Sequence, residues 1–167
     1  MTSIHSNKVY RILRKAFARS PLDGEGAYLY GGRWSSPGTR LVYTSEHQSL
    51  AMLEYFVHVD ADNAPPDLVL VTAHIPNECA KSQILAAQLP AGWRTSPASP
   101  ELANFGDEFV RKNDSCVLVV PSVQAPGENN GLLNPQHPDF RKVTVSGIEP
   151  LKYDSRMFER HRTRRKS

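Results

Sequence analysis

The sequence predicts an α+β fold, in which a single domain is built around a central mixed β-sheet. Two mostly apolar segments, residues 68–75 and 116–120, have the β-branched composition of buried strands. Two others, residues 45–58 and 101–112, carry apolar residues at helical spacing. Because these segments do not follow the regular strand–helix–strand order of a doubly wound sheet, the α+β class is favoured.

The N-terminal part of the chain is predicted to combine short strands with turns. Residues 8–14 form the opening strand, and residues 15–26, which include Pro21, form a loop. Residues 28–38 are rich in aromatic residues and glycine, which indicates a tight turn. A second brief strand then covers residues 41–44.

The helix at residues 45–58 is the clearest element of the sequence. Ser45 is a candidate N-cap, and Gln48 three residues later completes the pattern of a capping box. The apolar residues at helical spacing are Leu50, Leu53 and Val57. Because further apolar residues widen this stripe, the helix is predicted to be buried.

The remainder of the chain is predicted to hold less regular elements beside the buried strands. A short helix is expected at residues 82–89, a long polar loop at 123–139, and closing strands at 143–146 and 148–153. A loop of that length in a compact domain is usually functional or disordered. No repeat or linker divides the 167 residues, so one domain is expected.

The composition favours a soluble protein of a reducing cytoplasm. Hydrophobic residues make up 40% and charged residues 22% of the chain, as in ordinary globular domains. Cys79 and Cys116 are too few for a disulfide framework and lack zinc-ligand spacing. The N-terminus lacks the apolar segment of a signal peptide, and no run approaches the ~18 apolar residues of a membrane span.

The formal charge of +3 is concentrated at the C-terminus. Residues 160–167, RHRTRRKS, carry five Lys or Arg residues, and without them the charge of the chain becomes −2. Such a tail is typical of a solvated terminus, and it also permits contact with RNA or an acidic partner. An RNA-binding or RNA-degrading protein is therefore one hypothesis, although aromatic residues are not interleaved with these charges.

Glu54 is the residue with the strongest indication of a functional role. At helical spacing its neighbours are Leu50, Ala51, Val57 and His58, so it lies on or beside an apolar face. A carboxylate is rarely buried there without a partner. It either pairs with a core arginine or His58, or projects into a cleft as an acid, base or electrostatic stabiliser.

Three further side chains are candidates for a binding site. Arg33 lies beside a glycine pair and suits bidentate recognition of phosphate, or it stacks on Trp34 in a structural role. Tyr43 lies at a strand end and either stacks on a ligand ring or packs in the core. Ser122 follows a buried strand and either holds a ligand group or makes a local turn bond.

Several common motifs are absent. His47 and His58 flank Glu54 but lack the H-E-x-x-H spacing, so no metal site is expected. The segment GEGAYLYGG follows no convincing strand and opens no predicted helix, which argues against a dinucleotide fingerprint. Ser122 is not embedded in G-x-S-x-G, so a hydrolase nucleophile is poorly supported.

Six short segments, which span most of the chain, form a recognisable set when taken in order. They are VYRI (9–12), GGRW (31–34), LVYTSE (41–46), SLAMLE (49–54), VPS (120–122) and ENNGLLNP (128–135). Together they resemble the RES-domain family, the toxin half of bacterial RES–Xre toxin–antitoxin pairs. After GGRW the family usually has Asn, where this chain has Ser35, which keeps a small polar group.

The resemblance implies a fold like that of ADP-ribosyltransferases and an activity on NAD as substrate, without a metal. By position, Glu54, Arg33, Tyr43 and Ser122 would be the catalytic set. Arg11 would join Arg33, Tyr43 and Ser122 in binding NAD. The expected reaction is cleavage of the nicotinamide–ribose bond, and the alternative is ADP-ribosylation of a cellular protein.

The resemblance also implies partners and domain limits. A RES domain would cover residues 1–159, and the basic C-terminal tail would cover residues 160–167. A helix-turn-helix, Xre-like antitoxin would block the active site, and the toxin would form a homodimer within a larger complex. Neither membrane binding nor direct binding of nucleic acid is expected, except through the antitoxin.

Overall fold

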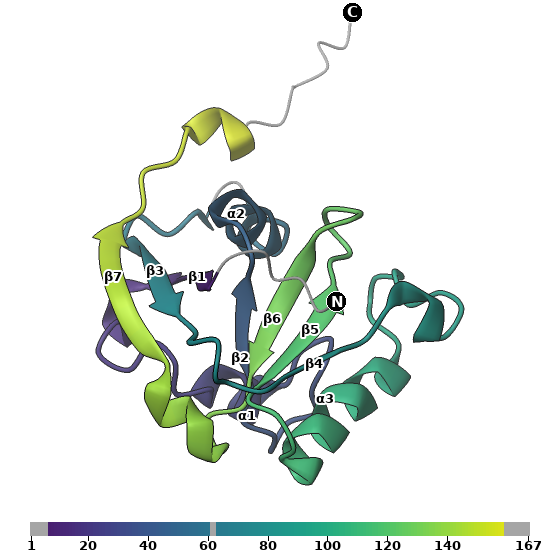
Figure 1. Cartoon of the computed structure of the whole chain (residues 1–167). Coiled ribbons are helices and arrows are strands. Elements are labelled where there is room, and N and C mark those ends of the chain that lie inside the picture. The colour runs from purple at the N-terminus through teal and green to yellow at the C-terminus, as the bar shows by residue number, and fades with distance from the viewer. Residues whose placement is uncertain (1–6, 61–62, 159–167) are drawn as a thin grey trace, which may run out of the picture.

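The fold is organised around one seven-stranded sheet. The computed structural model describes residues 7–60 and 63–158 (Figure 1). The strands are β1 (Lys8–Arg14), β2 (Val42–Ser45), β3 (Leu68–His74), β4 (Lys81–Gln83), β5 (Val117–Pro121), β6 (Asn129–Leu133) and β7 (Thr144–Pro150). Their order across the sheet is β4-β5-β6-β2-β1-β3-β7. The predicted α+β fold with a mixed sheet is confirmed.

The sheet is antiparallel except at one edge, where β4 and β5 run parallel. β1 is an interior strand, because it pairs with β2 through Tyr10 and with β3 over its full length. β2 in turn pairs with β6, which places Ser45 opposite Asn130. The first strand of the chain is thus flanked by strands distant in the sequence.

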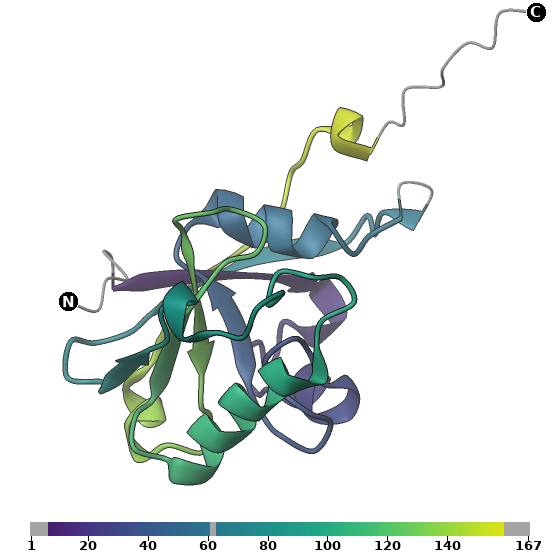
Figure 2. The same ribbon diagram turned by 90° about the vertical axis from the view of Figure 1, so that its right-hand side faces the viewer.

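Within residues 7–60 and 63–158, three α-helices and four 3-10 turns accompany this sheet. The helices are α1 (Glu25–Tyr30), α2 (Gln48–Phe56) and α3 (Pro100–Lys112), and the turns are η1 (Lys15–Phe17), η3 (Ala86–Gln88), η4 (Pro138–Lys142) and η5 (Ser155–Phe158). α2 packs against β1 and β2, while α3 lies beside β4 and β5 at the other end of the molecule (Figures 1 and 2). None of the described helices is long and apolar enough to cross a membrane.

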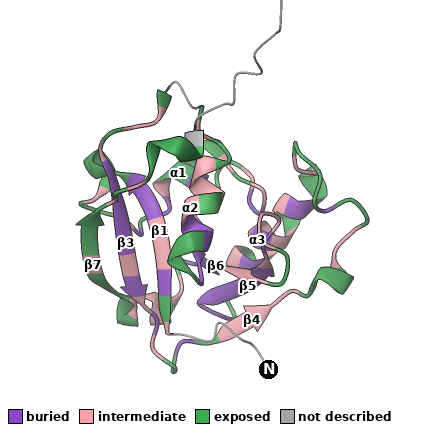
Figure 3. Cartoon of the chain, turned by 90° about the horizontal axis from the view of Figure 1, so that it is seen from above, coloured by how far each residue is buried: buried purple, intermediate pink, exposed green. Residues whose placement is uncertain are grey.

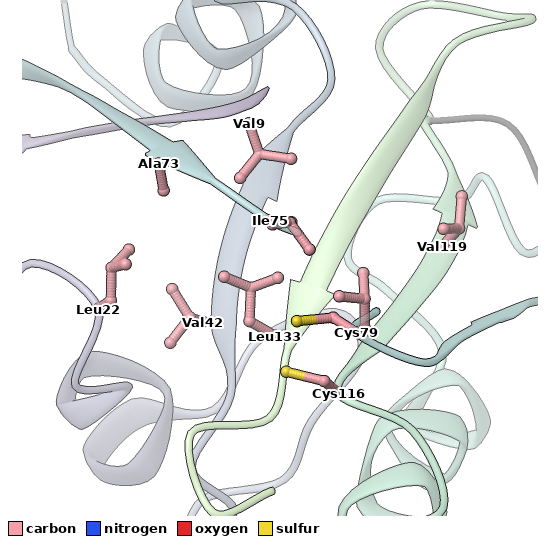
Figure 4. Packing of buried hydrophobic residues seen from close by; sticks show 10 residues of the cluster. Val9, Leu22, Val42, Ala73, Ile75, Cys79, Cys116, Val119 and Leu133 are labelled. Carbon is pink, nitrogen blue, oxygen red and sulfur yellow. The ribbon is translucent and has the colours of Figure 1, made fainter. Parts of the chain in front are cut away.

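The core consists of side chains from several strands. β3 and β5 are largely buried, whereas the edge strand β7 is exposed over nearly its whole length (Figure 3). The cluster in Figure 4 gathers Val9, Val42 and Leu133 from adjacent strands, together with the two free cysteines. Burial raises the pKa of the Cys116 thiol to about 12, which keeps this group neutral in the core.

The helix at residues 45–58 begins later than predicted. α2 starts at Gln48, and His47 occupies the N-cap without a side-chain capping bond. Ser45 belongs to β2, and its hydroxyl donates to Asn130 instead. The predicted Ser45 cap is therefore wrong, because strand pairing with β6 holds this residue in the sheet.

The burial predicted for this helix is also only partly correct. Leu50 and Ala51 are buried, but Leu53 and Val57 are 46% and 53% exposed. α2 therefore rests on the sheet with one side and leaves apolar side chains at the surface. A helix that is broadly apolar in sequence is here a surface helix.

Other differences concern short elements. α1 lies within residues predicted as loop and turn, and the predicted helix at 82–89 is instead β4 followed by η3. β6 lies within the predicted loop at 123–139, and the two predicted closing strands are one bulged strand, β7. The predicted tail at 160–167 lies outside the described residues.

The contact between α3 and the turn at Trp34 depends on a glycine. A Cβ atom at Gly106 would overlap the carbonyl oxygen of Trp34. We expect Gly106→Ala to lower the free energy of unfolding by about 1–3 kcal/mol, because the backbone there has no room to move without loss of packing. Denaturant unfolding of the variant measures this loss.

Gly26→Ala is the matched control for this substitution. Gly26 lies in α1, and nothing lies within 4 Å of a Cβ atom added there. Because alanine has a higher helix propensity than glycine, Gly26→Ala should leave the free energy of unfolding unchanged or raise it by up to about 1 kcal/mol. Equal stability of the two variants would contradict the proposed contact.

Candidate active site

Glu54 anchors the candidate site from the middle of α2. Its Oε1 atom accepts a hydrogen bond of 2.8 Å from the Ser122 hydroxyl and one of 2.7 Å from the Asn130 amide. These partners come from the end of β5 and from β6, respectively. Both bonds fall on one carboxylate oxygen, so the orientation of the carboxylate is fixed while Oε2 takes no part in them.

Ser122 makes the predicted local turn bonds and also holds the Glu54 carboxylate. Its side chain is almost fully buried, and its oxygen accepts hydrogen bonds from the backbone N–H groups of Gln124 and Ala125. These turn bonds leave the hydroxyl hydrogen free to be donated to Glu54. The local turn therefore orients the donor that holds the carboxylate.

Asn130 is a site residue that the sequence reasoning missed. Ser45 donates to its Oδ1 at 2.8 Å, which leaves its Nδ2 to donate to Glu54. The register of β2 and β6 produces this arrangement, because Ser45 and Asn130 are paired in the sheet. Asparagine beside glycine, as in ENNG, is typical of a turn, so nothing in the sequence indicated a separate role for Asn130.

Glu54 and Asn130 line a cavity of about 750 Å³ bounded by β1, β2, α1, α2 and the segment between β1 and α1. This volume lies in the range of small-molecule and cofactor sites. Arg11 and Tyr43 line the same cavity, as do the exposed side chains of Phe17 and Tyr30. The carboxylate is therefore accessible rather than sealed in the interior.

Arg11 brings a cation to this cavity from β1. Its Nη1 donates to the carbonyl oxygen of Tyr43 at 3.0 Å, and its Nε is buried without a partner among the described residues. Burial lowers the pKa of Arg11, and the nearby Asp23 raises it to a smaller extent. Because arginine titrates far above neutral pH, the side chain remains charged and retains unsatisfied donors.

Tyr43 forms another part of the wall, and its hydroxyl is engaged by the glycine-rich turn. It accepts from the Trp34 N–H at 3.1 Å and is hydrogen-bonded to the Ser35 hydroxyl at 2.8 Å. Gly32 packs so closely that an added Cβ would lie 2.5 Å from the Tyr43 hydroxyl. The turn thereby holds the phenol in place from behind.

Arg33 lies outside the lining of the cavity. Its Nη1 donates to the carbonyl oxygens of Trp93 and Thr95, at 3.0 and 3.1 Å, so it links the glycine-rich turn to a distant loop. Burial raises the pKa of the Tyr43 hydroxyl, and the positive charge of Arg33 is near enough to offset a small part of that rise. The structure thus brings Glu54, Ser122, Tyr43 and Arg11 together and places Arg33 behind Tyr43.

The buried hydroxyl of Tyr43 predicts a pH dependence of stability. Burial holds its pKa above the usual value of 10, so above pH 10 the unfolded chain loses this proton before the folded protein does. The contribution of Tyr43 is complete below pH 10 and is lost as the pH rises towards its folded-state pKa. The unfolding free energy of wild type should therefore fall in this range.

Tyr43→Phe separates this effect from other titrations. Below pH 10 the variant should be about 1–3 kcal/mol less stable, because the Trp34 N–H loses its acceptor. The difference between the two proteins should narrow between pH 10 and 11. Denaturant unfolding from pH 8 to 11 measures the difference, and a constant difference would show that the phenol ionises equally in both states.

Comparisons with known proteins identify the family of the chain. The RES domain family matches residues 8–154, which is most of the chain. A protein of Sphingobium sp. strain YBL2 named "Prs ADP-ribosylating toxin" is 34% identical over 148 residues, covering 87% of this chain and 92% of its own. "Toxin Res" of Photorhabdus laumondii is 38% identical over 152 residues, covering 89% of this chain and 96% of its own.

A solved structure has the same fold. It is the toxin–antitoxin complex MbcT–MbcA of M. tuberculosis, with a TM-score of 0.73 at 18% sequence identity over 92% of this chain and 87% of the matched chain. At that identity the likeness concerns the fold, and the sequence relatives carry the family assignment. The chain belongs to the RES domain family and is a RES-domain toxin of a toxin–antitoxin system.

Proposed function

We propose that this toxin binds NAD in the cavity beside α2 and cleaves the bond between nicotinamide and ribose, which depletes cellular NAD and arrests growth. The observation that carries the proposal is the Glu54 carboxylate, held by Ser122 and Asn130 in the wall of a cavity that also contains the Arg11 guanidinium. A fixed anion and a separate cation in one cavity suit a substrate with a ribosyl centre and a pyrophosphate.

The chemistry requires stabilisation of positive charge rather than acid catalysis. Cleavage passes through an oxocarbenium-like state at the ribose, as in glycoside hydrolysis, and nicotinamide leaves as a neutral molecule. Glu54 stabilises this charge through its field, or through a hydrogen bond from a ribose hydroxyl to its carboxylate. Because Ser122 and Asn130 already orient the carboxylate, little reorganisation is needed when the charge develops.

Arg11 is the side chain best suited to the pyrophosphate. Its Nε is buried and unpartnered among the described residues, and a phosphate oxygen would supply the missing acceptor. Arg33 was expected to share this role, but its Nη1 is occupied by two loop carbonyl oxygens. We assign to Arg33 a positioning role, in which it fixes the turn that holds the Tyr43 hydroxyl.

Tyr43 and Ser122 complete the proposed set. Tyr43 lines the cavity, and its ring would pack on nicotinamide or ribose. Ser122 would act through Glu54, because its hydroxyl hydrogen is donated to that carboxylate and not to the cavity. This replaces the direct contact of Ser122 with NAD that the family resemblance implied.

ADP-ribosylation of a cellular protein is the alternative reaction. It is favoured by the relative named "Prs ADP-ribosylating toxin", and it uses the same cleavage with a protein side chain in place of water or phosphate as acceptor. The two reactions differ in what releases nicotinamide. Release from NAD alone favours the first, and release only with added cell protein favours the second.

The proposed partner is a helix-turn-helix antitoxin of the Xre type that covers the cavity. The structural match to a toxin–antitoxin complex supports an antitoxin partner, and a homodimer within the larger complex is part of the same proposal. A cytoplasmic location is consistent with two free, buried cysteines. No metal is needed for the proposed reaction.

Glu54→Gln tests the proposed carboxylate. Glutamine retains an oxygen that accepts from Ser122 and Asn130 but removes the negative charge. We expect turnover of NAD to fall by about 10²–10³-fold, while the free energy of unfolding changes by less than about 1 kcal/mol. Nicotinamide release from purified protein and NAD, with denaturant unfolding in parallel, measures both quantities.

Glu108→Gln is the control, because Glu108 is an exposed carboxylate on α3 that pairs with Arg111 outside the cavity. This variant should turn over NAD at the wild-type rate. Wild-type turnover in a folded Glu54→Gln protein would exclude Glu54 as the charge-stabilising group.

Arg11→Lys and Arg33→Lys distinguish the two arginines. Lysine keeps the charge but loses the planar, bidentate donor set. We expect Arg11→Lys to raise KM for NAD by at least about tenfold, because the pyrophosphate loses its partner. Arg33→Lys should chiefly lower stability, since one ammonium replaces the link to two carbonyl oxygens. The reverse pattern would return the pyrophosphate role to Arg33.

A further inference from the structure

Three side chains of metal-ligand type meet beside the start of α2, outside the lining of the cavity. Glu46 and His47 precede the helix, and Glu128 precedes β6. One donor atom from each lies within 4.8 Å of the other two. No sequence motif predicted this group, because more than 80 residues separate its two segments.

His47 is turned towards Glu128 instead of capping the helix. It occupies the N-cap of α2 but makes no side-chain capping bond. Its Nδ1 lies 3.1 Å from Oε2 of Glu128, and both side chains are accessible, with exposures of 53% and 38%. An imidazole nitrogen and a carboxylate oxygen are thus presented together at a point that solvent reaches.

Glu46 supplies an independent indication of a missing ligand. It is only 5% exposed, and its Oε1 accepts a hydrogen bond from the Asn129 N–H at 2.5 Å. Its Oε2 is buried without a hydrogen-bond partner among the described residues. A buried carboxylate oxygen without a donor is costly, and a bound cation would remove that cost.

We propose that Glu46, His47 and Glu128 form a site for one divalent transition-metal ion, of which Zn²⁺ is the representative. Two carboxylates and a neutral imidazole balance a 2+ charge and match the ligand preferences of zinc. Zinc bonds of about 2.0–2.2 Å allow two ligand atoms to be at most about 4.4 Å apart. The distances in the structure reach 4.8 Å at most, so rotation of the exposed side chains of His47 and Glu128 by a few tenths of an ångström would bring the three donors within about this limit.

An ion at this position would connect the turn that contains Ser122 to the start of α2. The backbone oxygen of Glu128 accepts from the Ser122 N–H at 2.9 Å, so Glu128 closes the turn that orients Ser122. An ion shared by Glu128 and the start of α2 would fasten this turn to the helix that carries Glu54. The proposal concerns binding and stability, and it holds whether or not the protein acts on NAD.

Isothermal titration of chelator-treated protein with Zn²⁺ tests the site, with thermal unfolding in parallel. We expect one ion per chain with Kd below about 10 μM, and a rise in Tm of roughly 5 °C or more at a hundredfold excess over Kd. His47→Ala and Glu128→Gln should each weaken binding by at least about tenfold and remove most of the rise. Mg²⁺, which prefers oxygen ligands, should bind more weakly than Zn²⁺.

His58→Ala is the matched control, because His58 is an exposed histidine just beyond the other end of α2. It should bind Zn²⁺ as wild type does. The exposed positions 47 and 128 are chosen because substitution of the buried Glu46 risks unfolding. Binding weaker than about 1 mM, or unchanged binding in both site variants, would overturn the proposal.

Discussion

The structure depends on one interaction that joins three distant parts of the chain, the pair of hydrogen bonds from Ser122 and Asn130 to Glu54. The carboxylate is carried by α2, and its donors come from the end of β5 and from β6. A half-buried carboxylate needs such donors, because burial removes water that would otherwise solvate it. The bonds therefore stabilise the packing of α2 on the sheet and fix the chemical group that faces the cavity.

The strand register makes this interaction possible. Ser45 and Asn130 are paired across β2 and β6, and the Ser45 hydroxyl sets the orientation of the Asn130 amide. On the neighbouring strand, Arg11 retains its charge in a half-buried position with an unpartnered Nε. Such an arrangement is unfavourable in a core and is common at functional sites, where a ligand supplies the missing partner.

The sequence predicted the fold class and most strands, because buried strands leave local signals. It also drew attention to Glu54, a carboxylate beside an apolar stripe, and the structure places this residue in the wall of a cavity. It did not predict β6, since the segment ENNGLL carries turn-forming residues and becomes a strand only by pairing with β2 and β5. The cap predicted at Ser45 was wrong for the same reason, because pairing with β6 keeps this residue in β2. The position of Arg33 depends on a loop some sixty residues away, which no local pattern encodes.

We propose that NAD lies along the cavity from Arg11 to Glu54. A crystal structure of the Glu54→Gln variant with NAD tests it directly, because slow turnover would preserve the intact substrate. We expect the nicotinamide–ribose bond beside residue 54 and the pyrophosphate at the Arg11 guanidinium. NAD bound elsewhere, for example in the groove of about 720 Å³ beside α3, β4 and β5, would contradict it.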